Sequence, residues 1–280
     1  MKTFRTRSED ADNGTKWMEA ETMKSKDDAD RLFRKFQIQK FGARRMVPAV
    51  SMTIDADVTE LARVRASLNA QRPGEKHITI SHVVNKAACG VLADFPLLFA
   101  SFDGKKVVAN PDLVLSVPVD IENHVEYLVI RRPNAKTLDE FVAESAAELS
   151  RIQRGEGEFR AYLRSVMGKP LWIRRLIMRL PGRDIRFLRT RYGNFAISNF
   201  GSFGVDRGTV ALSKPMIASM CFGRIAGKAA GKPGGEASAQ VLSLSITFDH
   251  RAVDGGYVGR YLSSLREVLE NPDRLSGMLG

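Results

Sequence analysis

The histidine at position 250 ends an apolar, β-branched run in the stretch SITFDHRAVDGG, residues 245–256. An imidazole has an ordinary pKa of about 6.5, so it can accept a proton near neutral pH if its neighbours fix its tautomer and orientation. Asp249, Arg251 and Asp254 all lie within four positions of His250. The pattern favours a general base at the end of a strand, with a solvated polar loop as the alternative.

A second polar stretch, AISNFGSFG, places Ser198 and Asn199 at the end of another predicted strand, before two glycines. A donor at a strand end can stabilise a developing oxyanion, and one such donor can contribute roughly 10²- to 10³-fold in rate. Polar turns after strands are also common structural features. This stretch therefore indicates an active site only in combination with His250.

Apolar periodicity predicts the elements that must position these residues. Period-two alternation and β-branched runs indicate strands at about 50–54, 112–121, 125–132, 194–199, 216–222 and 239–249, with a hairpin around Asp103-Gly104. Capping residues and helical spacing indicate helices after Asp57, from a cap at Ser81, from Thr137 to Gly155, and from 255 to Pro272. Because these elements do not alternate strictly, they predict a mixed sheet covered by helices, a two-layer α/β (α+β) fold.

Composition narrows the class of protein. The 280 residues, 44% of them hydrophobic, suffice for one large core. We expect one domain from about 45 to 280, after a polar arm at 1–44 that includes a short amphipathic helix at 29–40. No apolar run is long enough to span a membrane and the N-terminus has no secretory pattern, so a cytoplasmic protein is expected. Cys89 and Cys221 are predicted to be buried thiols, and His77, His82 and His124 to lie at element edges without carboxylates, so no metal site is expected.

The two motifs together resemble a known family. His-Arg-x-x-Asp-Gly at 250–255 and Ser-Asn-x-Gly at 198–201 resemble the catalytic domain of the dihydrolipoamide acyltransferases, the E2 components of 2-oxo acid dehydrogenase complexes. The chain is similar, more distantly, to chloramphenicol acetyltransferase. The stretches VPAVSMTIDADVTELARVRASLN and ISHVVNKAACGVLADFPLLFASFDG add weaker similarity. The resemblance covers about residues 45–280 and implies trimers with each active site at a subunit boundary.

The resemblance also implies a role for each motif residue. His250 would remove the proton from an attacking thiol, Ser198 would steady the tetrahedral oxyanion, and Asp254 would orient the loop through a salt bridge. Coenzyme A, as acyl-CoA, would be one substrate, and a dihydrolipoyl group or another thiol, hydroxyl or amine would be the acceptor. Supporting positions would be Asn199, Arg251 and Gly255.

Two departures from the family bear on the substrate. Only about 45 residues precede the matched region, so a lipoyl group would have to come from a separate carrier protein, with none covalently bound to this chain. The family's Gly-Leu-x-x-Pro stretch is replaced by HVEYLVIRRP at 124–133. The acyl group and the acceptor therefore stay open. A non-catalytic trimeric scaffold, bound to a membrane or to a dehydrogenase complex, is the alternative function.

A basic segment at 160–191 is interpreted as an insertion. It holds ten Arg or Lys and one Asp, which accounts for most of the net charge of +11. Its central helix would place one apolar face (Trp172, Ile173, Leu176, Ile177, Leu180) against basic residues (Arg174, Arg175, Arg179). Three interpretations remain open: a subunit-packing helix, a binding face for coenzyme A phosphates or an acidic carrier protein, and contact with anionic lipid. Nucleic acid is not expected, since no RNA- or DNA-binding motif is present.

Overall fold

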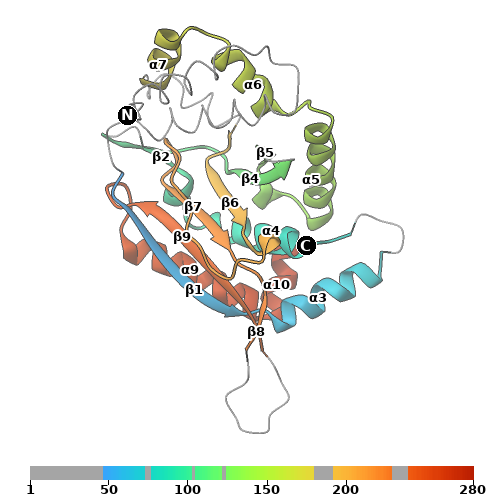
Figure 1. Cartoon of the computed structure of the whole chain (residues 1–280). Coiled ribbons are helices and arrows are strands. Elements are labelled where there is room, and N and C mark those ends of the chain that lie inside the picture. The colour runs from blue at the N-terminus through green and yellow to red at the C-terminus, as the bar shows by residue number, and fades with distance from the viewer. Residues whose placement is uncertain (1–46, 73–76, 103–104, 122–123, 180–191, 229–238) are drawn as a thin grey trace, which may run out of the picture.

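The computed structural model describes residues 47–72, 77–102, 105–121, 124–179, 192–228 and 239–280 (Figure 1). The expected arm 1–44 lies outside these residues. The strands are β1 (Ala49–Asp57), β2 (Ser101–Phe102), β3 (Val107–Val108), β4 (Val114–Ile121), β5 (His124–Arg131), β6 (Phe195–Asn199), β7 (Ala218–Phe222), β8 (Ala226–Lys228) and β9 (Ala239–Asp249). The helices are α3 (Thr59–Ala70), α4 (Ile80–Leu92), α5 (Leu138–Gln153), α6 (Glu158–Met167), α7 (Leu171–Arg179), α9 (Gly255–Glu270) and α10 (Pro272–Leu279), with 3-10 turns η1 (Pro96–Phe99), η2 (Pro133–Ala135) and η3 (Gly201–Phe203).

A seven-stranded mixed sheet forms the centre of the structure, in the order β1-β9-β7-β6-β4-β5, with β8 also paired to β9. β7, β6 and β4 run parallel, whereas β1–β9, β9–β7 and β4–β5 are antiparallel pairs. The fold class predicted from the sequence is confirmed. The expected hairpin is present as the pair β2–β3, and its Asp103-Gly104 turn lies outside the described residues.

Strand β9 shows how the period of two assigns the faces of the sheet. Leu242, Leu244, Ile246 and Phe248 are fully buried in the main core. Helices α4, α9 and α10 contact one another and cover this apolar face (Figure 1). Burial of one such side chain contributes about 1.5–3 kcal/mol. The end of β9, where His250 begins the following turn, is therefore held firmly.

The opposite face of β9 carries hydroxyl groups. The Oγ of Ser51 lies 2.9 Å from Oγ1 of Thr247, and Oγ1 of Thr53 lies 2.8 Å from Oγ of Ser245. Ser245 and Thr247 are buried, and a buried hydroxyl needs a partner to offset the loss of water. The hydroxyl ladder from β1 to β9 supplies that partner, so this face of the sheet is polar.

Helix α4 begins at a different cap from the predicted one. Thr79 is the N-cap: its hydroxyl accepts from the N–H of His82 at 3.2 Å, and Nδ1 of His82 accepts from the N–H of Thr79 at 3.2 Å. Histidine can replace the usual Glu of a capping box because its unprotonated ring nitrogen is an acceptor. The prediction of Ser81 as the cap is wrong, and the Ser81 hydroxyl has another partner.

The predicted start of α5 and the predicted end of α9 agree with the structure. Thr137 and Glu140 form the capping box of α5, and Gly155 beyond its end has a φ of 78°, as favoured by glycine. Helix α9 ends before Pro272, as predicted. Pro272 then begins α10, which the sequence reading did not predict and which packs against α4 and α9.

The basic segment forms helices α6 and α7, which lie at the top of Figure 1. Helix α6 is anchored by a second apolar cluster with β5 (Phe159, Tyr162, Leu163, Val166 and Met167, packed against Val125, Tyr127 and Tyr192). The predicted apolar face of α7 is only partly covered: Trp172 is 68% exposed and Leu176 50% exposed. Leu180 and the remainder of the segment to 191 lie outside the described residues.

Candidate active site

His250 is the first residue after β9, in the turn that leads to α9. The N–H of Asp249 donates to the carbonyl of Ile217 at 2.9 Å, and the N–H of His250 donates to the carbonyl of Pro48 at 3.1 Å. Neighbours on both sides of β9 therefore fix the backbone of His250. The carbonyl of Asp249 also accepts from the N–H of Ala252 at 2.9 Å, which closes the turn.

Asp249 and Arg251 form a bidentate ion pair across His250. Nε of Arg251 donates to Oδ1 of Asp249 at 2.9 Å, and Nη2 donates to Oδ2 at 2.6 Å; the backbone N–H of Arg251 also donates to Oδ1 at 3.0 Å. Burial alone would raise the pKa of Asp249, but the hydrogen bonds from Arg251 outweigh it, so the pKa lies below its ordinary value. The Arg251 guanidinium also lies over the Phe102 ring, 5.1 Å from its centre.

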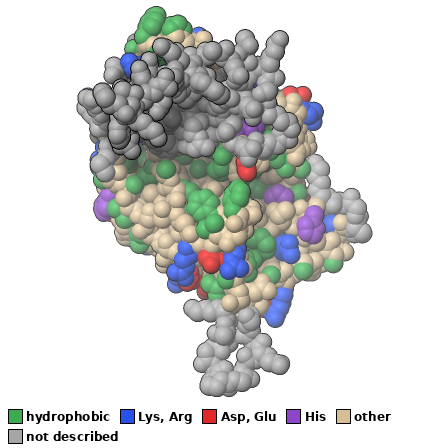
Figure 2. Space-filling model, in the orientation of Figure 1, with side chains coloured by type: hydrophobic (Ala, Val, Ile, Leu, Met, Phe, Trp, Pro, Cys, Tyr) green, Lys and Arg blue, Asp and Glu red, His purple; other side chains and the backbone are tan. Residues whose placement is uncertain are grey.

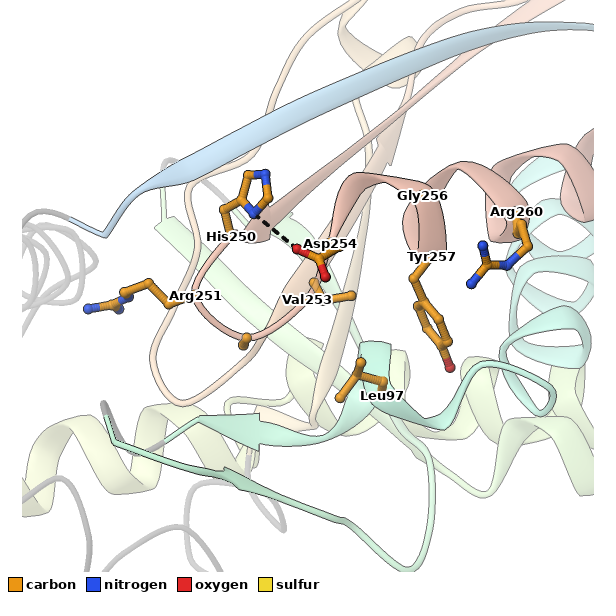
Figure 3. Close-up of a pocket in the computed structure, with 9 residues that line it drawn as sticks. Leu97, His250, Arg251, Val253, Asp254, Gly256, Tyr257 and Arg260 are labelled. Atoms are coloured by element: carbon orange, nitrogen blue, oxygen red, sulfur yellow. Dashed lines mark ion pairs between the residues drawn. The ribbon is translucent and has the colours of Figure 1, made fainter.

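Asp254 lies beside His250 in the structure. Its Oδ1 is 3.7 Å from Nδ1 of His250, as the dashed line in Figure 3 marks, and its side chain is 92% exposed. It makes no side-chain cap to α9. Asp249 and Arg251 form a second salt bridge in the same loop, and the role of Asp254 as anchor of the loop stays a prediction. The carboxylate of Asp254 is placed to face the imidazole.

A cavity of about 430 Å³ lies beside this turn. The residues that line it come from η1, the turn and the first half of α9: Leu97, His250, Arg251, Ala252, Val253, Asp254, Gly256, Tyr257 and Arg260 (Figure 3). The Arg260 guanidinium lies 5.7 Å from the centre of the Tyr257 ring. The imidazole of His250 is half exposed, so a ligand can reach it. The cavity combines an apolar wall with the guanidinium of Arg260, while the guanidinium of Arg251 is held by Asp249 and points away from Arg260 (Figure 3).

The basic residues predicted to bind coenzyme A do not line this cavity. Arg174 and Arg175 belong to α7, where Arg174 is half-buried and Arg175 exposed. The side chain of Arg179 lies outside the description. The cations beside His250 are Arg251 and Arg260. Sequence reasoning missed Arg260 because it lies ten positions beyond His250, and only its helical position on α9 returns it to the turn.

Ser198 lies far from His250 within one chain. Ser198 is paired with Cys221 of β7, and Cys221 with Ser245 of β9, five residues before His250. Two strand spacings and five residues of strand correspond to a separation of roughly 20 Å. The structure therefore brings Asp249, Arg251 and Asp254 together with His250, but it does not bring Ser198 to the same place.

Asn199 holds the turn after β6. Its Nδ2 donates to the hydroxyl of Ser81 at 2.8 Å, and its Oδ1 accepts from the N–H of Ser202 at 3.2 Å. The turn passes close to the end of β7, since a Cβ on Gly201 would lie 2.6 Å from the carbonyl oxygen of Gly223. Asn199 thus connects the Ser198 turn to the start of α4. Its amide is occupied by the fold.

Gly255, the remaining supporting position, is the first residue of α9. A Cβ there would lie 3.9 Å from Sδ of Met52, an ordinary contact. The space around it would therefore admit a small side chain, and its predicted role in close approach of a substrate stays a prediction.

Both cysteines are buried thiols, as predicted. Burial raises the pKa of the Cys221 thiol to about 11 and raises that of Cys89 further. A thiol with a raised pKa stays protonated at neutral pH and is a poor nucleophile. The candidate chemistry therefore rests on the imidazole of His250.

His124 differs from its prediction. It begins β5 in the stretch 124–133, is buried, and its Nε2 lies 3.5 Å from Oε1 of Glu126 and 3.1 Å from Nη2 of Arg160. Burial raises the pKa of Glu126, and Arg160 and Arg164 oppose that effect. The expectation of no carboxylate near His124 was wrong, because side chains two apart on a strand share a face. This cluster joins β5 to α6.

Within the ranges that the structure describes, no helix is both long and apolar enough to cross a bilayer. No group of three or more His, Cys, Asp or Glu side chains there could hold a metal ion.

Comparison with known proteins gives one family. The 2-oxoacid dehydrogenases acyltransferase (catalytic domain) family matches residues 33–159 and 173–276. The unmatched residues 160–172 fall inside the basic segment. A Bacillus subtilis protein, the dihydrolipoyllysine-residue acetyltransferase component of an acetoin cleaving system, is 28% identical over 229 residues, which is 81% of this chain and 50% of that protein. The chain thus spans about half the length of this curated relative.

Solved structures agree on the fold. The cubic core of a pyruvate dehydrogenase multienzyme complex has a TM-score of 0.67 at 19% identity, covering 99% of this chain and 100% of that chain. The Azotobacter vinelandii dihydrolipoamide acetyltransferase, studied for the role of a serine, a histidine and an asparagine in its catalytic mechanism, has a TM-score of 0.67 at 18% identity, with 99% and 100% coverage. A chloramphenicol acetyltransferase has a TM-score of 0.51 at 14% identity, with 88% and 96% coverage. The chain belongs to the family of the 2-oxoacid dehydrogenases acyltransferase catalytic domain.

Proposed function

We propose that this protein is a coenzyme A-dependent acyltransferase that moves an acyl group between coenzyme A and a second acceptor. The acceptor is a dihydrolipoyl group or another thiol, hydroxyl or amine, supplied by a separate molecule. The observation that carries the proposal is the half-exposed imidazole of His250, held on a fixed turn beside a cavity that Arg260 also lines. Family membership supports the same reaction class.

Residue spacing supports the assignment of the site. In the Azotobacter vinelandii enzyme the histidine follows the serine by 52 positions and the asparagine follows the histidine by four. In this chain His250 follows Ser198 by 52 positions, and Asp254 follows His250 by four. Asp254 thus stands where that enzyme has an asparagine. An aspartate there places a carboxylate 3.7 Å from Nδ1 of His250.

The proposed reaction begins with proton removal. A thiol with an ordinary pKa near 8.5 is poorly ionised at neutral pH, so an imidazole base raises the concentration of thiolate at the site. His250 takes the thiol proton, and the thiolate attacks the thioester carbonyl carbon. The Ser198 hydroxyl donates a hydrogen bond to the oxyanion of the tetrahedral intermediate. As the intermediate collapses, the carbon–sulfur bond to the leaving thiol breaks and the imidazolium returns the proton to that sulfur.

The complete site requires two chains. Because Ser198 and His250 are roughly 20 Å apart in one chain, a serine that acts with His250 must come from another copy. A heterologous contact repeated around a threefold axis would create three such sites. The trimer is therefore part of the proposal, and the cubic core structure, which has the same fold, supports an assembly of this kind.

The surroundings fit this chemistry without a covalent acyl-enzyme. Both cysteines are buried, so neither is placed to attack a substrate as a nucleophile. Arg260 is available to an anionic part of the substrate, and Leu97 and Tyr257 to an apolar part, whereas the Arg251 guanidinium is engaged by Asp249. Buried free thiols suit a reducing compartment, and we place the protein in the cytoplasm on that ground.

Acyl transfer from a panel of acyl-CoA donors tests the proposal. Release of free coenzyme A is followed with dihydrolipoamide, other thiols and amines as acceptors, for wild type, His250→Ala and Ser198→Ala. We expect His250→Ala to lose nearly all transfer and Ser198→Ala to lose roughly 10²- to 10³-fold. Gln153→Ala, at an exposed position at the end of α5, is the matched control and should retain the rate. Equal rates for His250→Ala and wild type would refute the mechanism, and no transfer from any donor would favour the non-catalytic scaffold.

A further inference from the structure

Helix α7 exposes an unusual amount of apolar side chain. Among the described residues, seven large hydrophobic side chains are exposed, and three of them lie on this helix. Leu171 is 43% exposed, Trp172 68% and Leu176 50%. Figure 2 shows hydrophobic side chains gathered at the top of the molecule, at the position of α7 in Figure 1. Isolated exposed apolar residues are ordinary, but a cluster that includes a tryptophan indicates a contact surface.

The helix period explains which side faces outward. Trp172 and Leu176 are four residues apart and so share one face of α7. Ile173 and Ile177 lie on the adjoining face and are half-buried. Arg175 lies on the other flank of Trp172 and is exposed. Helix α7 thus carries an outward apolar stripe with a cation beside it.

Helix α6, which precedes α7 in the chain, is anchored to the sheet. Its apolar cluster packs against β5, and Nε of Arg160 lies 3.4 Å from the buried carboxylate of Glu126. Helix α7 is itself already helical in the structure, so it does not need to fold when it meets a partner. The fold therefore already meets the cost of ordering the helix.

The charges around α7 have one sign. Residues 159–183 contain no Asp or Glu, while Lys169 and Arg175 are exposed and Arg164 is exposed on α6. A surface for another protein would usually mix both signs to fix a register. An apolar stripe with cations alone complements an interface whose charge is uniformly negative.

This surface is separate from the shared catalytic chemistry. Residues 160–172, which include most of α6 and the start of α7 with Leu171 and Trp172, fall outside the family match, whereas Arg175 and Leu176 fall inside it. None of these residues lines the cavity beside His250. A function for the α7 surface therefore does not depend on the proposed acyl transfer.

We propose that α7 docks this protein on an anionic lipid surface. Trp172 and Leu176 enter the boundary between headgroups and acyl chains, with Leu171 at the edge, while Lys169 and Arg175 contact acidic headgroups. One short helix binds weakly. Several copies of α7 in an oligomer would bind together and raise the overall affinity.

Vesicle co-sedimentation of the full chain tests this proposal. We expect binding to phosphatidylcholine vesicles that contain phosphatidylglycerol, and little binding to phosphatidylcholine alone. High salt should weaken it, because the headgroup contacts are exposed to screening. Trp172→Ala and Leu176→Ala together should lower the partition coefficient by about tenfold or more. Phe203→Ala, 65% exposed on η3, is the matched control and should bind as wild type does.

Charge and fluorescence add independent measurements. Arg175→Glu should weaken binding to acidic vesicles, whereas Arg154→Glu, the same charge change at an exposed arginine after α5, should not. In a Trp17→Phe background, in which Trp172 is the one remaining tryptophan, its emission should shift to shorter wavelength when acidic vesicles are added. His250→Ala should bind vesicles normally.

Three results would overturn the proposal. One is the absence of co-sedimentation with acidic vesicles by the full chain. Another is unchanged vesicle binding by the Trp172→Ala, Leu176→Ala double variant. The third is a loss of self-association in that variant, measured by sedimentation velocity without lipid, which would assign the α7 surface to a contact between copies of this chain.

Discussion

Ser198 lies near the end of β6, whereas His250 follows the end of β9, which runs antiparallel to β6 and is separated from it by β7. Strand β6 runs parallel to β7, and β9 runs antiparallel to both, so the residue that ends β6 lies beside the middle of β9. His250 instead follows the end of β9, next to the start of β7. A site that uses both residues must therefore combine two chains.

Mixed assemblies test this requirement. Ser198→Ala and His250→Ala chains, unfolded together and refolded at equal amounts, should regain about a quarter of the wild-type rate, because that share of boundaries receives an intact serine and an intact histidine from different chains. Each variant refolded alone is the control. A mixture no more active than the mean of its two components would show that these residues do not meet across a boundary.

The Asp249–Arg251 pair should govern the position of His250. Asp249→Asn removes the charge of a buried, doubly hydrogen-bonded carboxylate, and we expect the free energy of unfolding to fall by about 1–3 kcal/mol. The value of kcat should fall with little change in KM, since Asp249 positions the turn that carries the base and does not itself line the cavity. Arg251→Lys should also lower kcat, because the lysine ammonium cannot donate to both oxygens of Asp249 as the planar guanidinium does. Glu267→Gln, at an exposed pair with Arg274, is the stability control.

The same pair predicts a dependence of stability on pH. The pKa of Asp249 is lowered in the folded state, so its contribution is present above the ordinary carboxylate pKa and is lost as pH falls through the folded value. Urea unfolding at acidic pH should show this loss in wild type and a smaller loss in Asp249→Asn. Identical acid slopes for the two proteins would contradict it.

Asp254→Asn should have a much smaller effect than Asp249→Asn. The Asp254 side chain is 92% exposed and lies 3.7 Å from the imidazole. An exposed ion pair contributes about 0–1 kcal/mol, so kcat/KM should change by less than about fivefold and the melting temperature should hardly move. A loss as large as that of His250→Ala would identify Asp254 as the anchor of the loop.

His82 gives a second expectation for pH. Burial, and then the nearby charge of His77, lower the pKa of His82 in the folded state. The unfolded chain therefore binds the proton more tightly, and stability falls as pH drops through the unfolded pKa. His82→Gln keeps an acceptor for the capping box and should flatten this dependence between mildly acidic and neutral pH. His77→Gln, at an exposed site, should leave most of the dependence in place.

A pair of glycines tests the close packing beneath the Ser198 turn. A Cβ on Gly223 would lie 1.8 Å from the carbonyl oxygen of Asp206, whereas a Cβ on Gly277 in α10 meets nothing within 4 Å. Gly223→Ala should lower the free energy of unfolding by about 3 kcal/mol. Gly277→Ala should raise it by up to about 1 kcal/mol, since alanine favours a helix. Similar thermal unfolding of the two variants would contradict the packing of this turn.

The sequence by itself determined most of the framework and where the candidate residues lie in it. Local signals suffice to place His250 between a strand and a helix, because the apolar run before it and the glycines after it fix these two elements. The capping pair Thr137 and Glu140 is local in the same sense. Helix α10 was missed because proline after a helix is as compatible with a new first turn as with a stop.

Tertiary structure alone decided which of these residues meet. Arg251 pairs with Asp249 rather than with Asp254 because of the direction that its side chain takes in the turn. The spacing of these residues in the sequence does not encode that direction. The contacts of His124 with Glu126 and Arg160 depend on the packing of α6 against β5. The distance between Ser198 and His250 follows from the order of strands in the sheet. Pairing between strands joins residues remote in the sequence, so it decides contacts that no local pattern contains.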